Sequence, residues 1–299
     1  MNDDEAYILL LLSDSNLPTG SFVASAGLES YVAHGLFASV SQSGDALDIT
    51  TNFVRDSLAT YARSALPFVS DAHRLMEELM HSTWDDVEKG KERLSSALDS
   101  VKALDNLYEA MTLNHVARRA SKSQGVALLT LYSRGFSKPS MSLSHSREYA
   151  GQVGIGATRE ARPGKFIDAL KLKIRREDNH GHLPVCWGVL TAALGLSLER
   201  SQFLHLFLHA RSLLSASVRL NTLGPYAAQQ LLLHVVKPLV EVETSRCKHL
   251  RTGYDKPPSV SADSDNLLQE VSLGPAMTWP LGEILAARHD LQHSRIFNS

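Results

Sequence analysis

The chain has 299 residues, which is long enough to bury about three quarters of its unfolded surface in one large core. Its formal net charge of −2 excludes a general electrostatic attraction to nucleic acid or anionic lipid. The two cysteines, Cys186 and Cys247, lie far apart in no paired motif, which excludes a disulfide framework and fits a reducing compartment. The first apolar run, 6–12, is too short to span a bilayer and follows acidic residues, unlike a secretory signal. We therefore expect a cytoplasmic protein with neither a membrane nor a nucleic-acid partner.

Apolar residues recur at helical spacing along most of the chain. Residues 201–220 are apolar nearly all round, which predicts a central helix surrounded by others. Alternating strand patterns are essentially absent, so the sequence predicts an all-α, single-domain bundle of about eight to ten helices. Between 94 and 115, steps of three and four place the following residues on one helix face: Leu94, Ala97, Val101, Leu104, Tyr108, Met111 and His115.

Proline and glycine mark the ends of several predicted helices. Pro184 starts a short helix that ends at Gly195. Gly224 and Pro225 break the chain after the central helix, and Pro225 suits the first turn of the helix that follows. That helix should stop or kink before Pro238.

Two segments interrupt the helical pattern. Residues 133–164 are rich in Gly, Ser, Arg and Pro, and we expect a long exposed connection there. Residues 252–280 carry few apolar side chains, as is typical of a linker. We therefore expect a helical domain over 1–251 and, over 252–299, a linker followed by a flexible partner-binding tail.

The tail contains a short amphipathic helix. Its apolar stripe consists of Leu281, Ile284, Leu285 and Leu291. Such a helix either binds a partner or packs on its own domain, and the pattern alone leaves both open. A helix this short is marginal in water, so we expect it to be mobile in the free protein.

The sequence contains no recognisable catalytic motif. The residues around Gly164-Lys165 do not complete a phosphate-binding loop, and the glycines at 151–156 do not complete a dinucleotide fingerprint. A Gly-x-Ser-x-Gly elbow is also lacking. These patterns predict a scaffold or adaptor rather than an enzyme.

Histidine, with 13 copies, is the residue type that invites a metal site. His205 and His209 lie four apart in the most apolar predicted helix, where we expect core histidines that hydrogen-bond to their neighbours. His289 and His293 lie four apart in the terminal helix and are weak candidates for metal ligands, without an obvious third ligand.

The segment "LLSDSNLPTGSFVASAGLE" resembles the signature of the UreF family of urease accessory proteins, roughly L-x-x-x-L-P-x-G-[GS]-F-x-x-S-x-G-L-E. Four further segments are similar to family segments in the same order, namely "NHVARRASKSQGVALL", "GHLPVCWGVLTAALGL", "SASVRLNTLGPYAAQQLL" and "ARHDLQHSRIFNS". Pro225, Tyr226 and His293 depart from common family residues. In the opening signature the matching residues are Leu17, Pro18, Gly20, Phe22, Ser25, Gly27, Leu28 and Glu29.

The resemblance implies an all-helical, usually homodimeric protein without catalysis of its own. Such a protein would bind a UreD-type (UreH-type) accessory protein and recruit the GTPase UreG, so that nickel reaches apo-urease. It would bind no cofactor itself, because the complex handles the nickel. Two alternatives are a GTPase-activating regulator of UreG that inserts an arginine, and a helical nickel carrier or metal-dependent enzyme that uses the histidine pairs.

The resemblance also suggests roles for individual residues. Pro18 and Gly20 would form a rigid corner that lets Phe22 and Leu28 pack back on the preceding helix. Phe297 would be the anchor that a UreD-type partner buries. The matched positions expected at partner interfaces are Arg219, Leu223, Gly224, Gln229, Arg288, His289, Ser294, Arg295 and Phe297.

Overall fold

The computed structural model describes residues 3–14, 17, 24–37, 45–82, 87–137, 162–254 and 274–298. All regular structure in these ranges is helical, which confirms the all-α prediction. None of the helices in the described ranges is both long and apolar enough to cross a membrane. The α-helices are α1 (Asp3–Leu12), α2 (Leu28–Ala33), α4 (Ala46–His81), α5 (Val87–Met111), α6 (His115–Leu131), α8 (Arg162–Arg175), α9 (Leu183–Ala193), α10 (Leu198–Arg219), α11 (Pro225–Leu231), α12 (Lys237–Cys247) and α14 (Pro280–Ala287).

Three short segments continue α-helices with a different helical hydrogen-bond pattern. Two are π-helical, η1 (Tyr132–Phe136) after α6 and η2 (Leu232–Val236) after α11, and one is 3₁₀-helical, η3 (Arg288–Leu291) after α14. The chain passes through η2 directly before Pro238, which lies in the first turn of α12. A wider turn at that point agrees with the predicted stop or kink, because proline cannot donate to the preceding turn.

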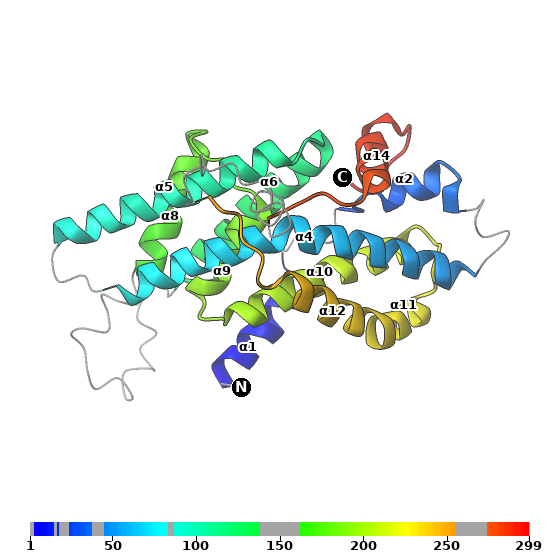
Figure 1. Ribbon diagram of the computed structural model, residues 1–299. Helices are drawn as coiled ribbons and strands as arrows, with labels where there is room; N and C mark the ends of the chain where they lie inside the picture. The colour runs from blue at the N-terminus through cyan, green and yellow to red at the C-terminus, as the bar shows by residue number, and fades with distance from the viewer. Residues whose placement is uncertain are drawn as a thin grey trace, which may run out of the picture.

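The 36-residue helix α4 runs through the middle of the molecule (Figure 1). Its N-terminus is capped by Asp45, whose carboxylate accepts a hydrogen bond from the Leu47 amide. Helix α9 makes the most extensive contact with α4, followed by α10. Gly188 permits the close approach of α9, because a Cβ atom there would lie 2.5 Å from the Val69 carbonyl oxygen.

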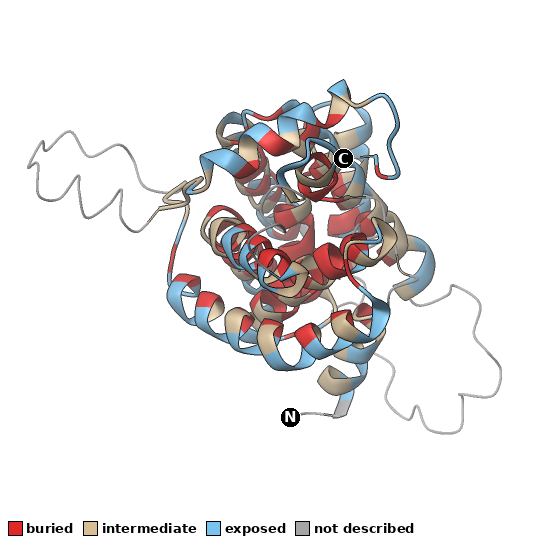
Figure 2. Ribbon diagram, turned by 90° about the vertical axis from the view of Figure 1, so that its right-hand side faces the viewer, coloured by how far each residue is buried: buried red, intermediate tan, exposed pale blue. Residues whose placement is uncertain are grey.

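Two hydrophobic clusters lie along α4, the first on its C-terminal half and the second on its N-terminal half. The first joins it to α5, α6, α8 and α9, with Trp187 and Phe166 among its largest buried side chains. The second joins it to α10, α11, α12 and α14. Buried residues gather around these contacts, and exposed residues cover the outside (Figure 2).

Most of the predicted helices are found near their expected positions. Helix α10 covers the predicted central helix, and Ser215 is the one exposed residue between 201 and 220. Helix α9 is followed by Gly195 at φ +82°, and α11 begins at Pro225. The single helix face predicted over 94–115 is wrong at its end, because α5 stops at Met111.

The chain turns between α5 and α6 because Asn114 starts a new helix. Its side-chain oxygen accepts hydrogen bonds from the amides of Val116 and Ala117 at 3.0 and 3.3 Å. An asparagine at this position satisfies amides that have no partner within the helix. His115 is therefore the exposed first residue of α6 and not part of the buried face of α5.

The predicted loop over 133–164 is only partly described. Residues 133–136 belong to η1 and 162–164 belong to α8, whereas 138–161 lie outside the described residues. The same holds for 255–273 in the predicted linker. Both described edges of that linker pack on α4: the Thr252 hydroxyl and amide donate to Asp71, and the Trp279 ring packs edge-on against Phe53.

Candidate functional site

The C-terminal segment packs on the chain's own N-terminal signature. We call residues 274–298 the tail and residues 25–34 the receptor. Helix α14 contacts α2 and α6, and η3 contacts α2 (Figure 1). Leu285, His289 and Phe297 are 2%, 1% and 3% exposed. The sequence left open whether the terminal helix binds a partner or packs on its own domain. In the structure the tail packs on its own domain.

Glu29 of the receptor holds the end of the tail. Its carboxylate accepts hydrogen bonds from the backbone amides of Ile296 at 2.5 Å and Phe297 at 3.3 Å. The same carboxylate lies 3.2 Å from Nε2 of His289. Glu29 is buried, and a buried carboxylate is tolerated where several donors surround it. The tail supplies those donors.

Gly27 lets α14 lie directly against the receptor. Its φ of +88° is a backbone conformation that favours glycine, and a Cβ atom there would lie 3.2 Å from Leu285 Cβ and from the Ala286 amide nitrogen. Ser30, two residues beyond Leu28, accepts a hydrogen bond from the Gln292 side chain at 2.7 Å. Gly27 and Ser30 thus both contact the docked tail.

The other signature residues have different positions. Leu17 packs partly buried against the first hydrophobic cluster, and Ser25 is fully buried. Leu28 belongs to the second cluster, whereas Leu12 of α1 belongs to the first. The expectation that Leu28 packs on the preceding helix is therefore wrong, because its side chain belongs to the second cluster with residues of α4, α10 and the tail. Pro18, Gly20 and Phe22 lie outside the described residues.

Charged residues tie the tail to α6. Asp290 binds the Arg119 guanidinium through both oxygens, at 3.0 and 2.9 Å, and Arg295 at 3.1 Å. The His115 imidazole lies 3.2 Å from the same carboxylate. Hydrogen bonds from Arg119, and to a smaller extent from His289 and His115, hold the pKa of Asp290 well below its usual range. Arg119 also donates to the Asn298 carbonyl at 3.2 Å.

Arg219 meets the tail at Phe297. The guanidinium carbon lies 4.4 Å from the centre of the Phe297 ring, over its face. The predicted partner anchor is therefore buried within the chain's own fold, because Glu29 and Arg219 enclose it. Leu223 is buried in the second hydrophobic cluster as well. The remaining predicted interface positions are on the surface: Gly224, Gln229, Arg288, Ser294 and Arg295.

The histidine candidates at 289 and 293 do not form a pair on a helix. His289 lies in the 3₁₀ turn η3 and uses Nε2 toward Glu29 and the Phe297 carbonyl, whereas His293 lies beyond the end of η3 and is exposed. His289 is buried because the tail is docked. Among the described residues there is no group of three or more side chains placed to hold a metal ion.

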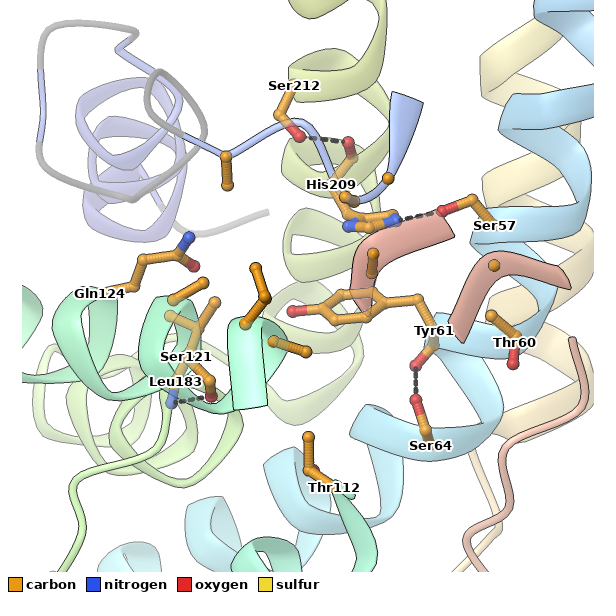
Figure 3. Close-up of a pocket in the computed structure, with 18 of the residues that line it drawn as sticks. Ser57, Thr60, Tyr61, Ser64, Thr112, Ser121, Gln124, Leu183, His209 and Ser212 are labelled. Atoms are coloured by element: carbon orange, nitrogen blue, oxygen red, sulfur yellow. Dashed lines mark hydrogen bonds between the residues drawn. The ribbon is translucent and has the colours of Figure 1, made fainter. Parts of the chain in front are cut away.

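A cavity of about 190 Å³ lies beneath the tail, between α4, α6 and α10 (Figure 3). Trp279, Gly282 and Glu283 of the tail form part of its wall. The carbonyl of Glu283 accepts a hydrogen bond from the Asn114 side chain at 3.0 Å, and burial raises the pKa of the Glu283 carboxyl. The tail therefore closes a hollow in the body and does not fill it.

His205 and His209 line this cavity as neutral, hydrogen-bonded core residues, as predicted. His209 Nε2 lies 3.0 Å from the Ser57 hydroxyl, and His205 Nε2 lies 2.9 Å from the Tyr61 hydroxyl. The Tyr61 ring stacks on His209 with 4.0 Å between ring centres (Figure 3). Burial lowers the pKa of His205 to about 3 and that of His209 to about 4, so neither carries charge at neutral pH.

Sequence reasoning missed three of the residues that hold the tail: His115, Arg119 and Asp290. The available signal was that they lie in two of the five segments that resemble one family, "NHVARRASKSQGVALL" and "ARHDLQHSRIFNS". These two segments and the opening signature meet at the tail and its receptor. Three separate sequence resemblances thus describe one place in the fold.

Comparison with known proteins supports the same assignment. The profile of the UreF family matches residues 48–236. The chain is 41% identical to urease accessory protein 6 of Cryptococcus neoformans var. grubii, in an alignment that covers 99% of this chain and 97% of that protein. The chain belongs to the UreF family. The resemblance inferred from its sequence motifs is thereby confirmed.

More distant UreF relatives extend over different shares of the chain. An uncharacterized UreF-like urease accessory protein of Schizosaccharomyces pombe is 28% identical over 99% of this chain and 97% of its own length. Urease accessory protein F of Oryza sativa subsp. indica is 30% identical over 77% of this chain and 69% of its own length. The family profile ends at residue 236, so the tail lies beyond it, whereas the alignments with the two fungal proteins cover nearly the whole chain.

Proposed function

We propose that this UreF-family protein is a non-enzymatic urease accessory factor. It joins a UreD-type protein to a UreG-type GTPase, so that nickel reaches apo-urease, and it binds no cofactor itself. The relatives that carry the name urease accessory protein support the biological setting. The feature that supports a partner-binding role is the outer face of the docked tail.

That outer face is apolar although the tail is docked. Ile284, Leu291 and Ile296 are 57%, 69% and 53% exposed, and Leu281 precedes them on the same stripe. Leu113 is also exposed and lies beside Asn114, which binds the tail at Glu283. A soluble protein seldom presents so many apolar side chains together unless another protein covers them. We assign this outer tail face to the UreD-type partner.

The assignment separates two roles that the sequence combined in the tail. Phe297 and His289 hold the tail on the receptor, and the exposed stripe contacts the partner. Arg295 and Arg288 flank the stripe and supply charged contacts at its rim, where they set specificity more than affinity. The docked tail is then a preformed binding surface, which avoids the cost of ordering a free helix on binding.

A capture experiment with the UreD-type and UreG-type counterparts from the same source tests the proposal. The double variant Ile284→Glu, Leu291→Glu should capture the UreD-type protein at least about tenfold more weakly and should lose UreG recruitment with it. Leu172→Glu is the matched control, because Leu172 is an exposed leucine on α8, away from the tail. Full capture by the double variant, with unchanged thermal unfolding, would contradict the assignment.

We also propose that the chain forms a homodimer through the outer face of α11, η2 and α12. Tyr226, Leu233 and Val242 are exposed on these elements, and the predicted interface positions Gly224 and Gln229 are exposed beside Tyr226. Leu233→Glu should shift the protein from dimer to monomer in sedimentation velocity, while Leu172→Glu should not. A wild-type protein that sediments as a monomer at micromolar concentration would contradict the proposed homodimer.

A further inference from the structure

A second cavity, separate from the tail, lies where α1 and the turn between α9 and α10 meet α4. Its volume is about 540 Å³. Asp4 of α1 and His73 and Glu77 of α4 are among its polar lining residues. Ile8, Met80 and Leu194 are partly buried apolar residues of the wall. None of the contacts that hold the tail involves these residues.

His73 presents an unused hydrogen-bond acceptor in this wall. It is 1% exposed, and its Nε2 lies 2.8 Å from the Leu196 carbonyl oxygen. A carbonyl oxygen only accepts, so Nε2 carries the hydrogen and Nδ1 carries a lone pair. Nδ1 has no hydrogen-bond partner. Burial lowers the pKa of His73, so the ring is neutral at pH 7 and Nδ1 stays an acceptor.

A second acceptor lies beyond hydrogen-bond distance of this lone pair. Glu77 Oε2 is 4.0 Å from His73 Nδ1, one helical turn further along α4. Two acceptors at this separation can share one donor that lies to the side of the line joining them. Glu77 is half-exposed, so its side chain can move aside to admit a ligand to the buried nitrogen. An acceptor without a partner in a buried position calls for an explanation.

The separation indicates which kind of donor fits. If a donor nitrogen lies about 2.9 Å from both acceptors, which are 4.0 Å apart, the acceptor–nitrogen–acceptor angle is about 90°. Two slightly bent hydrogen bonds accommodate this angle. A transition metal with bonds of about 2.1 Å would need an angle of about 145°, far from tetrahedral or octahedral geometry. The described residues also contain no group of three metal ligands here. The geometry therefore favours an N–H donor over a metal ion.

We propose that this cavity binds an aliphatic primary amine in its ammonium form. The ammonium group lies between His73 Nδ1 and the Glu77 carboxylate, and Asp4 adds a second negative charge at the mouth. The aliphatic stem lies against Ile8, Met80 and Leu194. Glu5 is occupied by the Ser197 amide and hydroxyl, at 3.1 and 2.6 Å, and it fixes α1 to the α9–α10 turn rather than contacting the ligand.

Titration calorimetry of the full chain at pH 7.5 tests this proposal with n-pentylammonium, with Nα-acetyl-lysine methylamide and with 1-pentanol. Saturable one-to-one binding of the amines, and none of the alcohol, is expected. Tighter binding of the lysine derivative would assign the ligand to a protein side chain, and tighter binding of pentylammonium would assign it to a free amine. Equal binding of the alcohol, or no saturable amine binding up to about 50 mM, would overturn the proposal and leave water as the occupant.

Two variants of α4 make the test specific. Glu77→Gln keeps the size of a half-exposed side chain and should weaken amine binding at least about tenfold. Glu78→Gln removes the same charge from the next residue, which is exposed and outside the cavity, and should leave the affinity unchanged. A nitrogen NMR signal of His73 Nδ1 that shifts on amine addition would report contact at that atom. Equal affinity in both variants, or an unchanged Nδ1 signal, would contradict the assigned position.

Discussion

The two halves of α4 are packed in different ways. On the C-terminal half, Gly188 brings α9 so close to α4 that a methyl group would not fit, and the surrounding cluster is apolar. On the N-terminal half, the tail packs Trp279 against Phe53 and forms part of the wall of a cavity of about 190 Å³. Polar contacts of Glu29, His289 and Asp290 hold the tail to the receptor and to α6. The close apolar packing of α4 and α9 should hold these helices together as one rigid unit. The tail is held largely by polar contacts beside a cavity, and its separation should cost less free energy. We therefore expect a rigid body and a tail that can be removed without unfolding the body.

The largest effect is expected from overpacking the α4–α9 contact. Gly188→Val would place side-chain atoms against the Val69 carbonyl, 2.5 Å from the Cβ position, and against Ala72 Cβ at 2.9 Å. We expect a loss of about 3 kcal/mol in the free energy of unfolding, measured by urea denaturation. Gly224→Ala is the control, since nothing lies within 4 Å of its added Cβ. Near-wild-type stability of Gly188→Val would show that the two helices can separate.

A smaller structural effect, with a large functional one, is expected from removing the tail. A chain that ends after Gly274 lacks Leu285 and Phe297, which belong to the second cluster, and it leaves Glu29 without its tail donors. We expect a folded, soluble protein with a lower thermal midpoint that no longer captures the UreD-type partner. Circular dichroism and the capture assay check both parts. Global unfolding after the cut would make the tail part of the rigid body.

Mild acid should weaken the body before it weakens the ionic contacts of the tail. The pKa values of His205 and His209 are lowered by burial to about 3 and about 4, below the value of about 6.5 in an unfolded chain. The unfolded state therefore binds more protons, and this stability is present above pH 6.5 and falls as the pH drops toward 4. Asp290, whose pKa is lowered, keeps its charge throughout that window.

Urea denaturation at pH 7.5 and pH 5.5 measures the loss in the body, and amide exchange of residues 289–298 follows the tail. Local opening of the tail should be no more frequent at pH 5.5 than at pH 7.5, because Asp290 keeps its charge. A tail that exchanges freely at pH 5.5 while the body remains folded would reverse the expected order.

The smallest effect is expected at Arg219. Arg219→Ala removes the contact with the Phe297 ring, which is worth about 1 kcal/mol. The thermal midpoint of the isolated protein should stay within a few degrees of the wild type, and capture of the partner complex should weaken because the tail is held less firmly. Arg211→Ala, on the same helix but bound to the Ser13 carbonyl, is the comparison. Aggregation of the Arg219 variant would indicate a purely structural role.

Features that depend on local spacing were predictable from the sequence. The nearly all-round apolar character of 201–220 predicts a central helix surrounded by others. Gly195 and Pro225 mark the boundaries of their helices through the backbone preferences of single residues. The neutral state of the core histidines His205 and His209 was also predictable, because their helix is surrounded by apolar residues that exclude solvent.

The docked tail could not be predicted in the same way. Its decisive contact joins the Glu29 carboxylate to two backbone amides, and a backbone amide has no signature in the sequence. The four residues predicted to form one apolar stripe do not share one environment, because Leu281, Ile284 and Leu291 are exposed whereas Leu285 is buried. Amphipathic spacing shows that a helix has an apolar side and does not show which protein surface that side contacts.

The contact between Glu29 and Phe297 spans 268 positions in the chain. During synthesis, the receptor leaves the ribosome long before the tail has been made. The Glu29 carboxylate therefore stays hydrated until its hydrogen-bond donors in the tail have been synthesised. A chain that is cut short before residue 274 lacks the outer tail face, and we expect it to keep the helical body. Under the proposed function, only chains translated through residue 297 would bind the UreD-type partner, so that the binding surface itself would report whether the chain is intact.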